Sequence, residues 1–136
     1  MTTQLSAARR GIITDEMKKV ANDEGVTPEW LRARMATGSI IIPANNVRPQ
    51  KVHRVGIGKG LKTKVNVNIG TSTLKVDLNE EIEKAQIAVK HHADSIMDPS
   101  DGGDVGNMRR ALLRAAPITF GTVPIYEAYM IGRAHV

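Results

Sequence analysis

The residues best suited to chemistry lie at the ends of three short apolar segments. Asn66 and Asn68 end the first segment, just before Gly-Thr-Ser. Met97 and Asp98 end the second, and Tyr126 follows the third. Amides and carboxylates form hydrogen bonds, and thioethers and phenol rings pack against small molecules. These residue types therefore indicate a binding site for a polar ligand.

Two asparagines on one strand need an explanation, because asparagine is a poor strand former and a buried amide needs hydrogen-bond partners. The alternation at 65–69 predicts a strand with apolar residues on one face and amides on the other. We expect Val65, Val67 and Ile69 to face outer helices, and Asn66 and Asn68 to face a ligand.

Each candidate also has a structural interpretation. Asn68 could be satisfied by a neighbouring backbone group, and Met97 could belong to a core. Asp98 and Asp101 could be turn and cap residues, and Tyr126 could simply cover the end of a barrel. No metal site is expected. His91 and His92 are sequence neighbours near a predicted helix end, so they do not share a helical face.

Residues 61–136 contain the elements that must position these groups. Strands are predicted at 63–69, 94–98 and 117–123, and helices at 78–91 and after Asp104. Asp77 and Glu80 form a possible capping pair for the first helix. This β-α-β-α-β order implies parallel strands. We expect the incomplete start of a (β/α)8 barrel, in which functional groups collect at the carboxyl ends of the strands.

Residues 1–60 form a separate region in this interpretation. Thr14 and Thr27 are expected to cap two helices, which end near Gly25 and Gly38. A short strand at 40–42 and a loop at 44–63 follow. The glycines of 56–60 have a spacing similar to that of phosphate loops. They lack the Lys-Ser/Thr ending and precede a strand, so a flexible connection is favoured.

The amino-acid composition further narrows the classes of protein and of functional site. The 136 residues carry a formal charge of +5 and no cysteine, which excludes disulfides, thiolate nucleophiles and cysteine metal sites within this chain. The basic residues concentrate at 48–64, where an anionic small molecule or solubility is favoured over nucleic acid. Since no signal peptide or bilayer-spanning apolar run is present, we expect a cytoplasmic protein without a membrane partner.

Several stretches resemble one enzyme family over nearly the whole chain, up to about Ala128. They are "ARRGIITDEMKKVANDEGV", "IIIPANN", "GIGKGLKTKVNVNIGTS", "ADSIMDPSDGGD" and "GTVPIYEA". The chain resembles the N-terminal part of the phosphomethylpyrimidine synthase and 5-hydroxybenzimidazole synthase family, which are non-canonical radical S-adenosylmethionine enzymes. The resemblance implies a (β/α)8 barrel and a lyase that rearranges 5-aminoimidazole ribotide. It implies that Asn68, Met97 and Tyr126, at equal intervals of 29 residues, contact this substrate.

The chain also departs from the family pattern. The resemblance implies a 4Fe-4S cluster, S-adenosylmethionine and a divalent metal such as zinc in the full-length enzyme. The family's Cys-x-x-Cys-x-x-x-x-Cys motif and metal-binding histidines are not in this chain. Pro99 and Asp101 replace the usual leucine and threonine. Three explanations stay open: part of a longer enzyme, which is favoured; half of a split enzyme with a complementing C-terminal segment; or a module retained for binding and self-association as a homo-oligomer.

Overall fold

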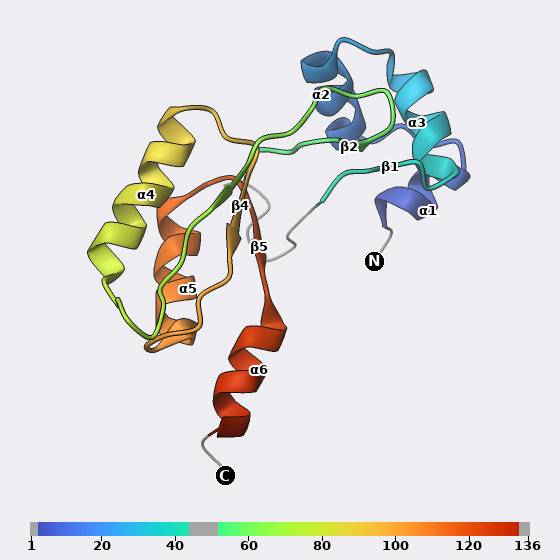
Figure 1. The fold of residues 1–136 in the computed structure, drawn as a ribbon. Coiled ribbons are helices and arrows are strands. Elements are labelled where there is room, and N and C mark those ends of the chain that lie inside the picture. The colour runs from blue at the N-terminus through green and yellow to red at the C-terminus, as the bar shows by residue number, and fades with distance from the viewer. Residues whose placement is uncertain (1–2, 44–51, 134–136) are drawn as a thin grey trace. The chain divides into compact units, whose positions relative to one another are not determined.

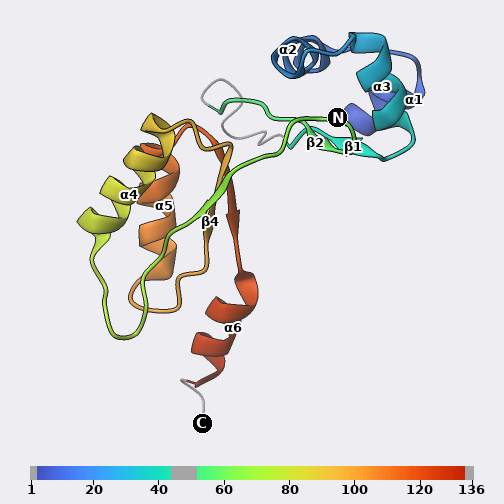
Figure 2. The same cartoon turned by 45° about the horizontal axis from the view of Figure 1, so that its top comes forward.

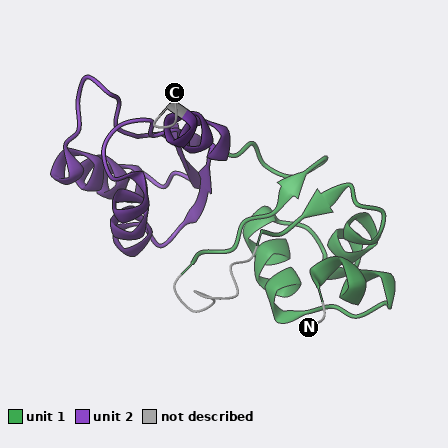
Figure 3. Cartoon of the chain, turned by 90° about the horizontal axis from the view of Figure 1, so that it is seen from below, with its two compact units in different colours: residues 1–64 green, residues 65–136 purple. Residues whose placement is uncertain are grey.

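The computed structural model describes residues 3–43 and 52–133. The chain divides into two compact units, residues 1–64 and residues 65–136 (Figure 3). Each unit has a hydrophobic core of its own. The two units are therefore described separately.

The first unit is mainly helical. Its elements are α1 (Gln4–Arg9), α2 (Asp15–Glu24), α3 (Pro28–Ala36), β1 (Ile40–Ile41) and β2 (Ile57–Gly58). The predicted helix starts are confirmed, because the Thr14 hydroxyl accepts the Met17 N–H and the Thr27 hydroxyl accepts the Trp30 N–H. Satisfying these otherwise unpaired N–H groups stabilises each helix by about 1 kcal/mol.

The sequence predicted that the glycine-rich segment is a flexible loop. Part of this segment is instead a strand. Ile57–Gly58 forms β2, which pairs antiparallel with β1. A Cβ atom at Gly58 would lie 2.3 Å from the Ser39 carbonyl oxygen, and one at Gly60 would lie 3.0 Å from the Trp30 ring. Both glycines also have positive φ, which favours glycine. Within the described residues, these glycines therefore serve close packing. Residues 44–51 of the predicted loop lie outside the described part.

Lysines of the basic stretch contact the end of α2. Lys64 Nζ lies 2.7 Å from Glu24 Oε1, and both side chains are largely buried. The Lys62 N–H donates to Glu24 Oε2 at 2.7 Å, and its ammonium donates to the Asp23 carbonyl. Cations at a helix C-terminus are stabilised by the helix dipole. This part of the stretch therefore has a structural role.

The second unit contains a three-stranded parallel sheet in the order β3-β4-β5. Its elements are β3 (Asn66–Asn68), α4 (Leu78–Lys90), β4 (Ser95–Asp98), α5 (Val105–Ala115), β5 (Thr119–Thr122) and α6 (Pro124–Arg133). The predicted α/β order is confirmed. Among the described residues the sheet is open and does not close into a barrel, so a partial barrel stays a prediction.

Helices α4 and α5 cover one face of this sheet (Figures 1 and 2). The largest buried side chains of the core between the sheet and the helices are Ile69, Ile96, Leu112 and Ile118. The expectation that Val65 also packs there is wrong, since its side chain is 57% exposed. Val65 precedes the first residue of β3 and so lies outside the strand.

The start of α4 differs in one detail from the predicted capping pair. The Asp77 carboxylate accepts the N–H groups of Asn79 and Glu80, as an N-cap should. The Glu80 carboxylate instead pairs with Lys75 and Lys84. In the described part of the chain, no helix is both long enough and apolar enough to cross a membrane.

Candidate functional site

The face of the sheet opposite α4 and α5 carries two rows of side chains. The parallel register aligns Asn66 with Ser95 and Ser95 with Thr119. One step further along the strands, it aligns Asn68 with Met97 and Met97 with Gly121. Residues two apart on a strand share a face, so both rows belong to the open face. The structure therefore brings two predicted binding residues, Asn68 and Met97, together as cross-strand neighbours.

A short hydrogen-bond relay joins the two rows. The Ser95 hydroxyl donates to Asn66 Oδ1 at 2.7 Å, and Asn66 Nδ2 donates to Asn68 Oδ1 at 3.2 Å. Both polar atoms of the Asn66 amide are therefore used within the sheet, and Asn68 takes part in the relay through its Oδ1 atom. The first amide of the strand, Asn66, therefore orients the second, Asn68.

Thr119 completes the first row. Its hydroxyl oxygen is buried and has no hydrogen-bond partner within the described residues. A buried hydroxyl without a partner is costly. The row therefore contains one further polar group, which is buried, next to Ser95.

A buried carboxylate supports the turn that follows β3. Glu81 of α4 is only 4% exposed, and its Oε2 accepts the Gly70 N–H at 2.7 Å. Its Oε1 accepts a hydrogen bond from Lys84 at 2.8 Å. That bond, together with a weaker contribution from the one that Lys84 donates to the Glu80 carboxylate, raises the pKa of the Lys84 ammonium above its ordinary value.

Sequence reasoning missed Glu81 as a functional residue. A signal was present, because Glu81 shares a helical stripe with the buried Ala85 and Ala88. A carboxylate on the buried side of a helix requires partners. The Gly70 N–H and the Lys84 ammonium are those partners.

The loops after β3 and β4 are tied together by buried polar groups. The Thr71 N–H donates to the Ser100 hydroxyl oxygen at 3.0 Å, and the Thr71 hydroxyl donates to the Gly102 carbonyl at 2.7 Å. Asp98 Oδ1 accepts the Ser100 N–H at 3.0 Å, which is the geometry of a turn residue. The carboxyl ends of the two strands are thus held in one arrangement.

Tyr126 belongs to a different element from the other two candidates. It lies in the first turn of α6, where its N–H donates to the Val123 carbonyl, and its side chain is 46% exposed. A cavity of about 290 Å³ lies between α6 and the start of α5. Glu127 lines this cavity and pairs with Arg109 at 2.7 Å. Tyr126 therefore follows the carboxyl end of β5, but it does not belong to the two rows.

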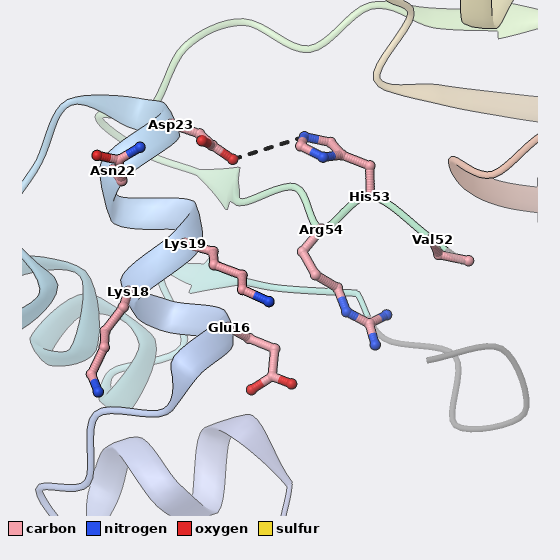
Figure 4. A pocket seen from close by; sticks show the side chains of 8 residues that line it. All are labelled: Glu16, Lys18, Lys19, Asn22, Asp23, Val52, His53 and Arg54. Carbon is pink, nitrogen blue, oxygen red and sulfur yellow. Dashed lines mark ion pairs between the residues drawn. The ribbon is translucent and has the colours of Figure 1, made fainter. Parts of the chain in front are cut away.

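A larger depression of about 860 Å³ lies in the first unit (Figure 4). Lys19, His53 and Arg54 extend toward it from α2 and from the segment before β2. Two carboxylates also line it. Asp23 lies 3.9 Å from His53 Nε2, and a hydrogen bond from its own backbone N–H lowers the pKa of Glu16. The lining therefore carries positive and negative side chains, and its charge does not favour the binding of an anion.

The residues present do not fit the iron–sulfur cluster or metal that the resemblance implies. The chain has no cysteine to ligate a cluster. No group of three His, Asp or Glu side chains that could hold a metal ion occurs within the described ranges. We therefore assign no chemical step of such a group to the residues of this chain.

Comparison with known proteins confirms the family resemblance. A family model described as "Radical SAM ThiC family" matches residues 3–135. Phosphomethylpyrimidine synthase of Thermodesulfovibrio yellowstonii is 50% identical over 125 residues, which is 92% of this chain and 29% of that protein. Phosphomethylpyrimidine synthase 1 of Methanothermobacter thermautotrophicus is 52% identical over 93% of this chain and 29% of its own length.

The phosphomethylpyrimidine synthase of Thermus thermophilus is 51% identical over 126 residues, again 93% of this chain and 29% of that protein. The chain thus spans less than a third of the length of these relatives. Because the family match covers nearly all of it, the chain belongs to the radical SAM ThiC family.

Proposed function

We propose that this chain supplies part of the substrate site of a radical S-adenosylmethionine lyase acting on 5-aminoimidazole ribotide. Asn68, Met97 and Tyr126 are the proposed substrate contacts, and the chain is not expected to be active alone. The observation that carries the proposal is the register of the open face, in which Asn68 and Met97 are direct partners. These two residues, matched by family motif, are cross-strand neighbours on the face opposite the one that α4 and α5 cover (Figure 2).

The chemistry of this row suits the proposed substrate. The ribotide combines an aminoimidazole ring with hydroxyl and phosphate groups. The Asn68 amide can donate hydrogen bonds to such acceptors. The Met97 thioether can pack against the flat ring, since sulfur–aromatic contacts are favourable. In this proposal the residues bind and orient the substrate, and the relay from Ser95 through Asn66 holds the Asn68 amide in place.

We propose the thiamine branch, in which the product is 4-amino-5-hydroxymethyl-2-methylpyrimidine phosphate. Support comes from the relatives, which are named phosphomethylpyrimidine synthases. The alternative product within this family is 5-hydroxybenzimidazole. The cluster and S-adenosylmethionine supply the radical chemistry when bound, and their ligands would come from outside this chain.

Reconstitution tests the proposed activity. The chain is co-expressed with the segment of the Thermus thermophilus relative that follows its match, and the cluster is rebuilt with iron and sulfide. With S-adenosylmethionine, reductant and the ribotide, we expect the pyrimidine phosphate to form. Asn68→Ala should reduce its formation, whereas Asn79→Ala on the exposed surface of α4 should not. A stable, cluster-loaded assembly that yields no product would contradict the proposal.

A self-associating binding module is the second candidate. The observation that favours it is the apolar surface of α6, where Ile125 is 67% exposed and Ile131 is 59% exposed. Exposed apolar patches on a folded chain commonly mark association sites. Sedimentation velocity tests this role. A concentration-dependent dimer that Ile131→Lys dissociates, and that Leu74→Lys leaves intact, would support it, and a strict monomer would exclude it.

A further inference from the structure

Gly121 of β5 lies next to Met97 of β4, and the Met97 side chain extends over it. The two residues are cross-strand partners in the parallel sheet. A Cβ atom built at Gly121 would lie 3.1 Å from Met97 Cε and 3.3 Å from Met97 Sδ. Such contacts are shorter than ordinary van der Waals packing, which is about 3.5–4.0 Å between carbon atoms. The thioether therefore occupies the space that any side chain at position 121 would need.

The backbone itself does not call for glycine at this position. Gly121 is not among the glycines of this chain with positive φ. Glycine weakens a strand, because it loses more conformational freedom on folding and offers no side chain to pack. A glycine inside a strand commonly marks a close approach of other atoms. Here the approaching atoms are those of Met97.

We infer that Gly121 is a positioning residue, which sets where the Met97 thioether lies beside Asn68 on the open face. The substrate part of this inference rests on the proposed function. Met97 lies between Asn68 and Gly121 in the row, so a methyl group at 121 displaces the thioether away from β5. The displaced Met97 side chain either narrows the space over Asn68 or moves away from the aminoimidazole ring of the proposed substrate.

The displacement should not unfold the protein. The Met97 atoms nearest to position 121 belong to the end of a flexible, unbranched side chain, which adapts readily. Gly121→Ala should therefore keep its thermal midpoint while moving Met97. A valine at the same position should move Met97 further.

The experiment uses the full 136-residue chain labelled with ¹³C at the methyl groups of its six methionines. The Met97 methyl resonance is assigned by its loss in Met97→Leu. We expect it to shift in Gly121→Ala. The matched control is Gly106→Ala on α5, where the nearest atoms to a new Cβ lie at 3.6 and 3.7 Å. Gly106→Ala should leave the chemical shift of the Met97 methyl group unchanged.

Calorimetric titration with 5-aminoimidazole ribotide gives the functional measurement. The Met97 thioether would lose its favourable sulfur–aromatic contact with the imidazole ring, so we expect Gly121→Ala to weaken binding by up to about tenfold. In a Met97→Ala background, Gly121→Ala should cause little further loss, because its effect passes through Met97.

The outcomes separate the two proposals. An unshifted Met97 resonance, or equal affinity of the wild-type chain and Gly121→Ala, would overturn the positioning role while the proposed function stands. Additive losses in the double variant would also overturn it. No binding by the wild-type chain, with or without a methyl shift, would overturn the contribution of this chain to the substrate site.

Discussion

The Glu81 carboxylate accepts the N–H of Gly70 at 2.7 Å, so a residue of α4 fixes the turn that directly follows β3. The turn begins two residues after Asn68. The carboxylate is 4% exposed, and its other oxygen accepts a hydrogen bond from Lys84. The orientation of the candidate site thus depends on a helix on the opposite face of the sheet.

Glu81→Ala should destabilise the second unit. It leaves the part-buried Gly70 N–H without its acceptor, so we expect a loss of about 1 kcal/mol, the lower end of the cost of an unsatisfied buried donor. Urea unfolding of the variant and of the wild-type chain measures the difference. Glu81→Gln keeps an acceptor and should recover part of the loss. Glu83→Ala, on the exposed side of the same helix, should change stability by less than about 0.5 kcal/mol.

The ion pairs of Glu80 should make stability depend on pH in the acid range. Hydrogen bonds from Lys75 and then Lys84 lower the pKa of Glu80 to about 2, from an ordinary value of 4.5. A lowered pKa in the folded state stabilises the protein above pH 4.5, and this contribution is lost as the pH falls toward 2. Glu80→Gln should therefore lose less stability over this range than the wild-type chain.

Chemical unfolding at several pH values between 6 and 2 measures this difference in slope. Glu83→Gln is the matched control, because it removes a carboxylate of α4 without touching the Lys75 and Lys84 contacts. Parallel stability curves for the wild-type chain and Glu80→Gln would refute the assigned pKa shift.

Leu112 should be a major source of stability in the second unit. Its side chain is fully buried between α5 and the sheet. Truncation of a buried leucine to alanine costs about 2–5 kcal/mol, since apolar contacts are lost and a cavity remains. Leu74, which is 96% exposed, provides the control, and Leu74→Ala should cost less than about 0.5 kcal/mol. Comparable losses for the two variants would contradict the described core.

The relay on the open face predicts an indirect effect of Ser95 on ligand binding. Ser95→Ala removes the hydrogen bond to Asn66, which in turn holds the Asn68 amide. A hydrogen bond contributes about 0.5–1.5 kcal/mol, so affinity for the ribotide should fall about two- to tenfold. Ser95→Thr keeps the hydroxyl and should bind more tightly than Ser95→Ala. Equal binding by both variants would show that the relay does not act on Asn68.

Much of both units could be predicted from local patterns. The caps at Thr14, Thr27 and Asp77 and the alternation around Asn68 depend on neighbouring residues, so they are visible in the sequence. The structure confirms the order of helices and strands. The strand at 57–58 was missed, because its partner β1 lies far along the chain and glycine is a poor strand former.

The candidate site was harder to predict. Asn68 and Met97 could be chosen by motif, but their direct pairing depends on register, which no local pattern specifies. Glu81 and Gly121 gain their roles only from contacts with distant residues, the Gly70 N–H and the Met97 side chain. Val65 was assigned to the core by alternation alone, and alternation does not show where the sheet begins.

Titration of 5-aminoimidazole ribotide into the purified 136-residue chain tests the central claim most directly. Calorimetry should show saturable binding, and Asn68→Ala should weaken that binding by about tenfold or more while the thermal midpoint stays unchanged. Asn79→Ala, another asparagine of the second unit, should bind like the wild-type chain. The absence of saturable heat with the wild-type chain, or equal binding by Asn68→Ala, would contradict a substrate site on the open face of the β3-β4-β5 sheet.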